Sequence, residues 1–500
     1  MKKVKQQFKS WREEVTRHRT VYCMLFLILA GGFFVRVYRL GDLLGFYYDQ
    51  GRDALVIWDL IYKSKTFLIG STTGIEGIFL GPLYYYVIAP FYWVSGGDPV
   101  GPAVFLGVLT TAAAAVLFYL GKRYFSYGAG LVAAFIFSFS YYVVIASRWL
   151  SNPTPLLLVS CFVLLGLGKV LEGKAWGWVL AVGAAGAGLQ FEAASATFFL
   201  PVLMVFALWQ GRKIGWKMWI FSLAVFGLLL SPQIIFNFRH GGILVMAFKK
   251  FLLGEKSFRP EGLGSLIGKR MDFYYQVFGV KILPGYLHLV KWFLVAGGVG
   301  LVWAKGKEKF WLVCVVTLFA PLVSLLFYQG NHGYVWDYYF TGVYGVFILL
   351  LAVGIVSFAR WWWGYLIILV FLCFFAFDNG RMLKNYLIAG VDGPEHITLG
   401  NMKQAVDWIF TDAKGRRFNV DTYVPPVIPY SYDYLYLWMG TSKYGKVPEG
   451  AAEKLLYTLY EVDPPHPERL EVWMERQKGI GKIEEEVRFG GIGVQRRERL

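Results

Sequence analysis

The sequence predicts an all-α polytopic membrane protein with a small soluble α/β domain at its C-terminal end. Hydrophobic residues make up 56% of the 500 residues and charged residues only 17%, too few to cover a water-soluble globule of this size. Apolar runs recur from Val21 to Phe377, whereas the chain after about Asp378 has the mixed composition of a soluble domain. We therefore expect a membrane module over residues 1–378 and a soluble domain over residues 379–500.

Twelve apolar segments are candidates for membrane spans, because a hydrocarbon core about 30 Å thick is crossed by roughly 20 helical residues. Their centres lie near residues 28, 89, 110, 136, 162, 185, 202, 227, 295, 319, 348 and 370. The second segment, residues 82–97, differs from the others because it contains Pro90 and is rich in tyrosine and tryptophan, which favour the headgroup level. We expect it to be interfacial or re-entrant, which leaves about eleven spans.

Basic residues in the short connectors predict which loops face the cytoplasm. The N-terminal stretch is basic and leads into an apolar run without a cleavage site, so we expect an uncleaved first span that starts in the cytoplasm. The other basic connectors carry Lys122 and Arg123, Lys169 and Lys174, Arg212, Lys213 and Lys217, Lys305, Lys307 and Lys309, and Arg360. This assignment requires that only one of the second and third segments crosses the membrane. Twelve full crossings with one misassigned connector is the alternative.

The same topology places the soluble domain and the loop over residues 37–81 outside the cytoplasm. The loop over residues 237–284 is also expected outside, although its basic residues outnumber its acidic ones. Either the topology is inverted, or this basic outer loop works at an anionic membrane surface. The other connectors favour the second interpretation. We therefore expect a multi-pass protein of the cell membrane with an extracytoplasmic C-terminal domain.

The formal net charge of +17 does not predict a nucleic-acid partner, because the basic residues are spread over short loops and form no single patch in the sequence. The lipid bilayer is the expected partner. All four cysteines lie in apolar runs, so we expect packing residues and no disulfide framework. The sequence contains no Walker-type, HExxH or CxxC motif, which argues against nucleotide hydrolysis, zinc peptidase and thiol redox chemistry.

The soluble domain should contain both helices and strands. Residues Met402 to Phe410 have an amphipathic helical pattern, and FNVDTYV, residues 418–424, is typical of a strand. The segment PPVIPYSYDYLYLW, residues 425–438, is rich in proline and tyrosine and is expected to be a turn region. A hairpin is expected through GGIG near Gly490.

The strongest local signal for chemistry is FYYDQGRD, residues 46–53, just beyond the first span. Asp49 is flanked there by aromatic residues and followed by Arg52 and Asp53. A positioned carboxylate can accept the proton of an acceptor hydroxyl as that hydroxyl attacks a sugar carbon, so Asp49 is the candidate catalytic base. A structural ion pair is the alternative interpretation of the same residues.

Two further acidic residues are candidates for substrate binding. Glu76 lies between glycines in TTGIEGIFLGPLYYY, residues 72–86, and either orients a sugar hydroxyl or is a solvated loop carboxylate. Glu192 lies inside the apolar stretch GLQFEAASATFFLP, where a carboxylate is costly unless it is paired or lines a polar cavity. We expect Glu192 to line a cavity.

The sequence from about Val21 to Phe377 resembles the GT-C superfamily of membrane glycosyltransferases, in particular the branch that contains protein O-mannosyltransferases and the lipid A aminoarabinose transferase. The resemblance rests on the acidic residue after the first span, the GPLYYY segment, the connector GKRYFSYGAGL and the motif ASRWLSNPTPLLL. It implies a polyprenyl-phosphate-linked sugar as the donor. It also matches Asp49 to the catalytic base of the family.

Two positions depart from the pattern of the family. Gln50 follows Asp49 where the family often has glutamate, and Asn152 stands near the family's second acidic position. Asparagine cannot act as a carboxylate, so the sequence does not support a divalent metal site, and no cofactor is identified. Arg148, in the same motif as Asn152, is suited to bidentate contact with phosphate.

Four more residues are candidates for substrate binding by their position. Arg239 and His240 in NFRHGG directly follow a span, where the phosphate of a lipid-linked sugar would lie. An arginine at that place either binds phosphate or is a snorkelling anchor. His332 and Asp337 lie in the last outer connector, YQGNHGYVWDYYF.

We therefore predict an inverting glycosyltransferase that moves a hexose or pentose from a polyprenyl-phosphate donor to a lipid, glycan or protein acceptor outside the cytoplasm. The alternative is a transporter or flippase of lipid-linked saccharides, which many spans and buried charges would also suit. A transporter should have paired halves with similar interrupted helices, and no such repeat is evident in the sequence.

Overall fold

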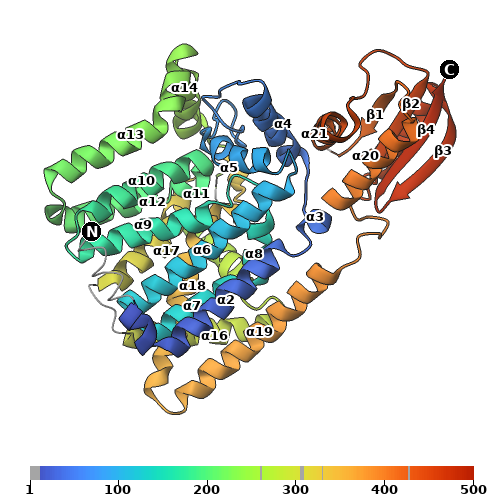
Figure 1. Ribbon diagram of the computed structural model, residues 1–500. Coiled ribbons are helices and arrows are strands. Elements are labelled where there is room, and N and C mark those ends of the chain that lie inside the picture. The colour runs from blue at the N-terminus through green and yellow to red at the C-terminus, as the bar shows by residue number, and fades with distance from the viewer. Residues whose placement is uncertain (1–11, 260–261, 305–308, 329, 426–427) are drawn as a thin grey trace.

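The computed structural model describes residues 12–259, 262–304, 309–328, 330–425 and 428–500. The connector residues Lys305 and Lys307 lie outside these ranges. Two parts are visible in Figure 1, a bundle of long helices and a small domain with a β-sheet at the C-terminal end. The predicted fold class is confirmed.

The bundle contains every predicted apolar segment, since each of the twelve predicted centres lies inside a described helix. Its apolar helices are α2 (Arg19–Val37), α5 (Leu83–Val94), α6 (Val100–Tyr124), α7 (Tyr127–Phe139), α8 (Tyr141–Arg148), α9 (Leu156–Leu171), α10 (Trp176–Phe191), α11 (Ala193–Ala196), α12 (Phe199–Gln210), α13 (Trp216–Arg239), α16 (Leu287–Trp303), α17 (Phe310–Leu326), α18 (Tyr344–Val356) and α19 (Gly364–Ile388).

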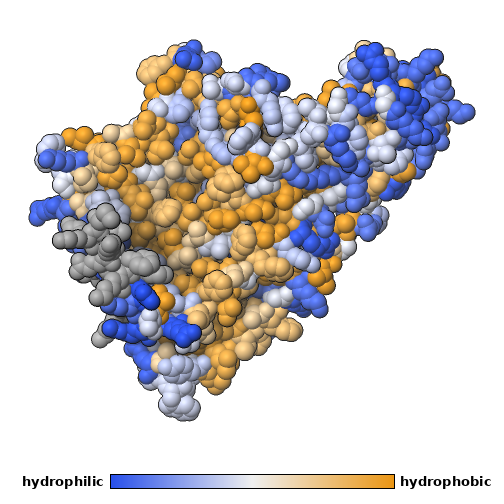
Figure 2. All heavy atoms as spheres, viewed as in Figure 1, coloured by the Kyte–Doolittle hydropathy of each residue, from blue (hydrophilic) through white to orange (hydrophobic). Residues whose placement is uncertain are grey.

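Among the described residues, six helical stretches are long and apolar enough to cross a membrane, and the bent pair of α7 and α8 makes a seventh. The helices α9, α10, α16 and α17 are apolar too but have only 16 or 17 residues each. Figure 2 shows a broad hydrophobic surface over the helical bundle and a hydrophilic surface over the small domain. The bundle therefore has the surface that a hydrocarbon environment requires.

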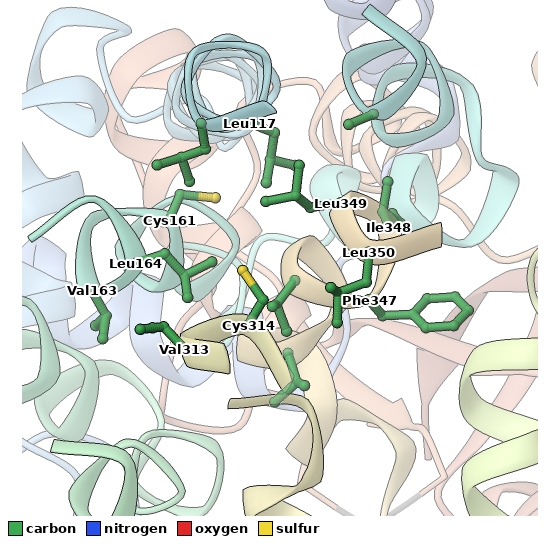
Figure 3. Close-up of a cluster of buried hydrophobic side chains, with 14 of the residues drawn as sticks. Leu117, Cys161, Val163, Leu164, Val313, Cys314, Phe347, Ile348, Leu349 and Leu350 are labelled. Carbon is green, nitrogen blue, oxygen red and sulfur yellow. The ribbon is translucent and has the colours of Figure 1, made fainter. Parts of the chain in front are cut away.

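Buried apolar side chains from distant helices form the interior of the bundle. Leu117, Cys161, Cys314 and Leu349 come together from α6, α9, α17 and α18 (Figure 3). Both cysteines are free thiols, and Cys23 and Cys373 are also free but exposed. Cys161 and Cys314 therefore act as small apolar packing residues, as the sequence predicts.

The N-terminal region and the first two basic connectors lie at one end of the bundle. Lys122 pairs with Glu14 at 2.6 Å, and the Tyr127 hydroxyl donates to the same carboxylate. Arg123 pairs with Glu172 at 2.8 Å, which joins this connector to the one after α9. Because the N-terminal region and the 122–127 connector share one end, two crossings, α2 and α6, suffice between them.

The segment around α5 does not add a crossing. This helix has 12 residues and is about 18 Å long at 1.5 Å per residue, which is shorter than a hydrocarbon core. Its residues Tyr84, Tyr85, Ile88 and Tyr92 are buried, whereas Trp93 and Val94 are exposed, so one face of the helix packs against the protein. A short helix with one exposed aromatic and apolar face is compatible with the expected interfacial or re-entrant segment.

The opposite end of the bundle carries the loops predicted to be outer. The first contains α3 (Leu40–Leu43), α4 (Tyr48–Tyr62) and a tight two-stranded turn closed by a bridge between Thr72 and Phe79. The basic loop contains α14 (Ile243–Lys249), η2 (Lys250–Gly254), α15 (Leu263–Tyr274) and η3 (Tyr275–Val280). The last connector forms η5 (Asn331–Gly333) and η6 (Asp337–Val343).

The C-terminal domain contains α20 (Leu399–Ala413), β1 (Asn419–Tyr423), α21 (Tyr430–Met439), η8 (Gly440–Tyr444), β2 (Leu455–Glu461), α22 (Pro467–Lys478), β3 (Gly481–Phe489) and β4 (Ile492–Arg499). The sheet order is β1-β2-β4-β3, with β1 and β2 parallel and the other pairs antiparallel. The helix, the strand and the hairpin that the sequence predicts here correspond to α20, β1 and the β3–β4 pair.

Two details of this domain differ from the prediction. Residues 430–439 form the helix α21, so most of the expected proline- and tyrosine-rich turn region is helical. The last span, α19, continues to Ile388, and its buried Asp378 accepts a hydrogen bond from the backbone of Gly285. The boundary placed at residue 378 therefore falls inside a helix, because the change to a mixed polar composition after about Asp378 was interpreted as the end of the span.

Candidate active site

Asp49 lies in the first turn of α4, immediately after the first span and the short helix α3. Gln50 accepts a hydrogen bond from the backbone N–H of Tyr47 at 3.0 Å, which caps the start of the helix. The glutamine that departs from the family's pattern is therefore a buried capping residue. An acidic residue such as Asp49 in the first turn also stabilises a helix through its dipole.

Arg52 joins Asp49 to Asp53. Its Nη1 lies 2.8 Å from Asp49 Oδ1, and its Nη2 lies 2.8 Å from Asp53 Oδ1. The Asp49 side chain is 58% exposed, whereas Asp53 is buried. Among the described residues, none forms a hydrogen bond with Asp49 Oδ2. The arrangement holds an accessible carboxylate in one orientation and leaves one of its oxygens available to a substrate.

Buried polar side chains contact Asp53 and lie next to it. The Tyr85 hydroxyl of α5 donates to Asp53 Oδ1 at 3.2 Å. Burial raises the pKa of Asp53 to about 6, in spite of the opposite charge of Arg52. Ser71 lies beside Tyr85, and its hydroxyl accepts a hydrogen bond from Asn152 Nδ2 at 2.7 Å. A row of polar groups therefore runs from Asp49 to Asn152, and the amide of Asn152 acts in it as a donor.

Glu192 lies at a break between α10 and α11. Its carboxylate caps α11 by accepting a hydrogen bond from the backbone N–H of Ala194 at 3.2 Å. The negative charges of Glu192 and Asp49 both act on the hydroxyl of Tyr338 in η6. The Tyr338 ring packs edge-on against Trp149. Asp49, Glu192 and Tyr338 thus belong to one region at the outer end of the bundle.

The C-terminal domain packs directly on the helix that carries Asp49. A Cβ atom at Gly51 would lie 2.2 Å from the backbone nitrogen of Ser431 in α21, so only glycine permits this approach. Tyr48 packs edge-on against Tyr430 with ring centroids 4.9 Å apart. Figure 1 shows α21 beside α4. The sequence did not indicate α21 as part of the site, because residues 425–438 have the composition of a turn region.

Arg148 is buried at the end of α8, and most of its donors are used by the bundle. Its Nη1 donates to the carbonyls of Val35, Arg36 and Tyr38 at the end of α2, at 2.9 to 3.1 Å, and its Nε donates to the Tyr386 hydroxyl. Its Nη2 has no hydrogen-bond partner in the described part of the chain. The side chain therefore ties α8 to α2 and α19, and one donor remains for another group.

Arg239 and His240 end α13 and are both exposed. His240 stacks on Phe236 and donates through Nδ1 to its carbonyl at 2.8 Å. Glu76 is 89% exposed and pairs with Lys250 of the basic loop at 3.2 Å. This pair joins two outer loops at the surface, which agrees better with a solvated loop carboxylate than with a buried sugar ligand.

His332 and Asp337 lie on either side of an exposed turn. The backbone N–H of His332 donates to Ser257 of the basic loop at 2.8 Å. Asp337 pairs with Lys281 at 2.7 Å, and the Lys281 ammonium lies over the rings of Tyr142 and Tyr344. Both residues therefore connect outer loops, and neither contacts the Asp49 cluster.

Arg270 of α15 was not singled out from the sequence, yet it is buried with unused donors. It lies over the Phe258 ring at 5.3 Å, and its Nη1 donates to the Gly333 carbonyl at 3.3 Å. Its Nε and Nη2 have no partner in the part of the chain that the structure describes. A guanidinium that is buried with two unpaired donors is a candidate anion ligand.

Three tyrosines lie near Arg270 or near the Asp49 cluster. Tyr328 lies within electrostatic range of Arg270 and of Tyr339, and the Tyr339 ring packs against Tyr338 with centroids 4.9 Å apart. Tyr338 in turn lies in range of Asp49.

The polar side chains do not form a carboxylate pair for a divalent cation. Asp53 is engaged by Arg52 and Tyr85, and Asn152 stands where a second carboxylate would be needed. Within the described ranges, no three histidine, cysteine, aspartate or glutamate side chains come together as a metal-ligand group. The residues present therefore do not fit a two-carboxylate metal site.

Known proteins resemble this chain in fold and over part of its sequence. The family described as dolichyl-phosphate-mannose-protein mannosyltransferase matches residues 80–236. No curated protein sequence matches the chain significantly. The match includes α5, the connector after α6 and the Arg148–Asn152 motif, three of the features on which the resemblance to GT-C glycosyltransferases rests.

Solved structures extend the likeness to the whole chain. ArnT from Cupriavidus metallidurans, bound to undecaprenyl phosphate, is 10% identical, with 96% of this chain and 98% of that chain aligned at a TM-score of 0.59. The arabinofuranosyltransferase AftD from Mycobacteria is 13% identical and aligns over 95% of this chain and 40% of its own length, with a TM-score of 0.54. The chain therefore has the GT-C glycosyltransferase fold, and the predicted resemblance is confirmed.

Proposed function

We propose that the protein is an inverting glycosyltransferase that moves a sugar from a polyprenyl-phosphate donor to an acceptor hydroxyl on the extracytoplasmic side of the membrane. The observation that carries the proposal is the exposed Asp49 carboxylate, held by Arg52 at the end of the first span. The fold shared with a transferase bound to undecaprenyl phosphate supports a lipid-linked donor. The basic connectors support a cytoplasmic N-terminus and an extracytoplasmic C-terminal domain.

In the proposed reaction Asp49 accepts the proton of the acceptor hydroxyl. The hydroxyl oxygen forms a bond with the anomeric carbon, the bond from that carbon to the phosphate oxygen breaks, and the electron pair leaves with the polyprenyl phosphate. Attack from the face opposite the leaving group inverts the anomeric configuration. Arg52 would keep the carboxylate aligned, while Glu192 and Tyr338 would line the sugar-binding region.

The developing charge on the leaving phosphate needs preorganised donors, because such electrostatic stabilisation is commonly the largest catalytic contribution. Arg270 has two unpaired donors and Arg148 has one. Arg239 is exposed at the membrane edge and would attract the donor from the bilayer. We therefore assign phosphate stabilisation to Arg270 and donor capture to Arg239.

Substitution of the two arginines separates these roles. Arg270→Ala is expected to reduce the transfer rate at least about tenfold at saturating donor, because it removes charge stabilisation from the transition state. Arg239→Ala is expected to raise the apparent donor KM, with a larger effect at low ionic strength, and to leave the saturated rate nearly unchanged. Steady-state kinetics at two salt concentrations measure both effects.

The exposed Lys256, also in the basic loop, is the matched control for Arg239, and Lys256→Ala should change the donor KM by less than Arg239→Ala does. Equal donor affinity for Arg239→Glu and the unsubstituted protein would remove Arg239 from donor capture. A normal saturated rate for Arg270→Ala would remove Arg270 from phosphate stabilisation.

The Asp53 ionisation predicts an acid limb in the pH dependence of transfer. Above the pKa of about 6, Asp53 is charged and pairs with Arg52. Below it the carboxylate is protonated and no longer holds Arg52 in place, so the rate at pH 5 should be about one tenth of the rate at pH 7. In Asp53→Asn the rate should be low, and this limb should be absent. An unchanged limb in Asp53→Asn would assign it to another group.

The effect of the same ionisation on stability has the opposite sign. The folded-state pKa of Asp53 lies above its ordinary value of 3.8, so the folded protein binds this proton more readily than the unfolded chain does. Its contribution to stability therefore falls as the pH rises from about 4 to about 6, while the rate rises. Comparison of thermal midpoints with rates over this range distinguishes loss of activity from loss of structure.

The proposed function is tested with the purified full-length chain in vesicles that contain a radiolabelled polyprenyl-phosphate sugar. With an extract of cell-envelope acceptors, the protein should release free polyprenyl phosphate in proportion to the sugar transferred. A transporter or flippase would instead move the intact donor between leaflets and release none. Intact donor after prolonged incubation with every acceptor fraction would contradict the proposal.

A further inference from the structure

The segment formed by α14 and η2, residues 243–254, exposes large apolar side chains beside the end of α13. In Figure 1, α14 runs across the direction of α13 and projects from the bundle, and Figure 2 shows hydrophobic residues on the surface of this projection. The exposed apolar residues are Ile243, Val245, Met246, Phe248, Leu252 and Leu253. An exposed apolar patch of this kind marks contact with a partner or with a membrane.

A tight corner fixes the level of this segment relative to the span. Gly241 and Gly242 follow α13 directly, and their positive φ angles turn the chain. The side-chain oxygen of Asn237, still within α13, accepts hydrogen bonds from the backbone N–H groups of Leu244 at 3.0 Å and Val245 at 3.2 Å. Because the turn is this short, α14 starts at the level where the span ends.

The opposite face of the segment is attached to the first outer loop. Leu244 is buried, and a Cβ atom at Gly77 would lie 3.0 Å from the Cβ of Ala247. Lys250 pairs with Glu76 at 3.2 Å. One face of the segment is therefore held against the protein, which directs the apolar face to the surroundings.

Basic side chains accompany the apolar face. Lys249 lies between Phe248 and Leu252 in the sequence and is exposed. Arg239 precedes the segment and Lys256 follows it, and both are exposed as well. The sequence from residue 239 to residue 256 contains one acidic residue, Glu255. Apolar side chains next to lysines are typical of a helix that lies in the headgroup layer of an anionic membrane.

We propose that α14 and η2 form an amphipathic anchor that lies in the headgroup layer at this end of the bundle and binds anionic lipid. The apolar side chains enter the boundary of the acyl chains, and Lys249 contacts lipid phosphate groups. A lipid surface is favoured over a protein partner because the corner keeps this face at the membrane edge. Through Lys250 and Glu76 the anchor also joins the first outer loop to the lipid surface.

The test measures contact between this segment and lipid in the full-length protein. The exposed Cys23 and Cys373 are replaced by alanine, and Met246→Cys carries a fluorophore on the apolar face. The protein is placed in phosphatidylcholine vesicles that contain equal small amounts of either phosphatidylglycerol or phosphatidylcholine with a nitroxide near the headgroup. Both nitroxide lipids should quench the fluorophore, and the anionic one should do so about fivefold more strongly, since one basic residue near the surface attracts anionic lipid to about that extent.

Two substitutions and one position serve as controls. Lys249→Glu in the Met246→Cys protein should remove the preference for the anionic lipid and keep quenching by the zwitterionic one. Lys414→Glu, at an exposed lysine of the C-terminal domain, makes the same change in net charge and should keep the preference. A fluorophore at Val472→Cys, an exposed apolar position on α22, should be quenched by neither lipid.

The results do not depend on the proposed function, because no sugar substrate takes part. Absence of quenching at Met246→Cys by both lipids would overturn the anchor and indicate that protein covers this face. Equal quenching by the two lipids, or an unchanged preference in Lys249→Glu, would overturn the binding of anionic lipid.

Discussion

Replacement of Asp49 by asparagine is expected to reduce sugar transfer by at least about a hundredfold while the protein inserts and folds normally. Asparagine keeps the size and polarity of the side chain but cannot accept the proton of the acceptor hydroxyl. The carboxylate is exposed and its ion pair with Arg52 lies at the surface of α4, so its loss should cost little stability. Initial transfer rates and thermal midpoints in detergent measure the two quantities.

Asp42→Asn is the matched control for this substitution. Asp42 lies in the same outer loop and is also exposed, and it pairs with Arg39 at 3.1 Å. Its substitution removes a comparable surface ion pair and should leave the transfer rate within about twofold of normal, since a surface pair contributes less than about 1 kcal/mol. Near-normal turnover by Asp49→Asn would exclude Asp49 as the base.

Replacement of Gly51 by valine is expected to have the second largest effect. The nearest atoms to an added Cβ are the backbone nitrogen and Cα of Ser431 and the carbonyl carbon of Tyr430, at 2.2 to 2.4 Å. Backbone atoms cannot rotate away, so α21 must separate from α4 or tilt it. A shift of about 1 Å in a catalytic group can reduce a rate about a hundredfold, and the transfer rate of Gly51→Val should fall by that order.

Two comparisons keep this prediction specific to the contact between α4 and α21. Gly41→Ala adds the same atom where no neighbour lies within 4 Å and should be close to normal. Gly51→Ala should be intermediate between valine and glycine in kcat, with donor KM unchanged, because the donor arginines lie elsewhere. A normal kcat in Gly51→Val would mean that the C-terminal domain does not position Asp49.

The helices of the bundle were predictable because their signal is local. An apolar run of sufficient length requires a helix in the membrane, since only a helix satisfies its own backbone there. The same argument distinguished the segment of α5, which the structure shows as a helix of 12 residues. The end of α19 was placed too early because the composition of the sequence becomes mixed after about Asp378, and the contact of Asp378 with the Gly285 backbone joins residues that are distant in sequence.

The sequence around Asp49 also indicated the candidate base, but it did not indicate the residues that hold this part of the helix in place. The FYYDQGRD motif shows Asp49 beside Arg52, and it gives no sign that Asp53 is buried against Tyr85. That contact depends on how α5 packs under the first outer loop. From the sequence, Asn152 only lacks the carboxylate of the family's second acidic position, whereas in the structure its amide donates to Ser71 in the same polar row.

Two features of the site could be recognised only from burial and packing. Arg270 has neighbours in sequence like those of any other basic residue in its loop, and only its unpaired buried donors distinguish it. The helix α21 was obscured by Pro425, Pro429 and a run of tyrosines, which favour turns and strands in isolation. Its packing on α4 outweighs that local preference.

The measurement that tests the central claim most directly follows the two halves of the donor separately. A polyprenyl-phosphate sugar labelled with ¹⁴C in the sugar and ³²P in the phosphate is incubated with the reconstituted protein and an acceptor extract. The account predicts that ¹⁴C passes to the acceptor while ³²P remains with the polyprenyl chain, and that Asp49→Asn prevents the separation. Joint movement of both labels, to an acceptor or to the opposite leaflet, would contradict it.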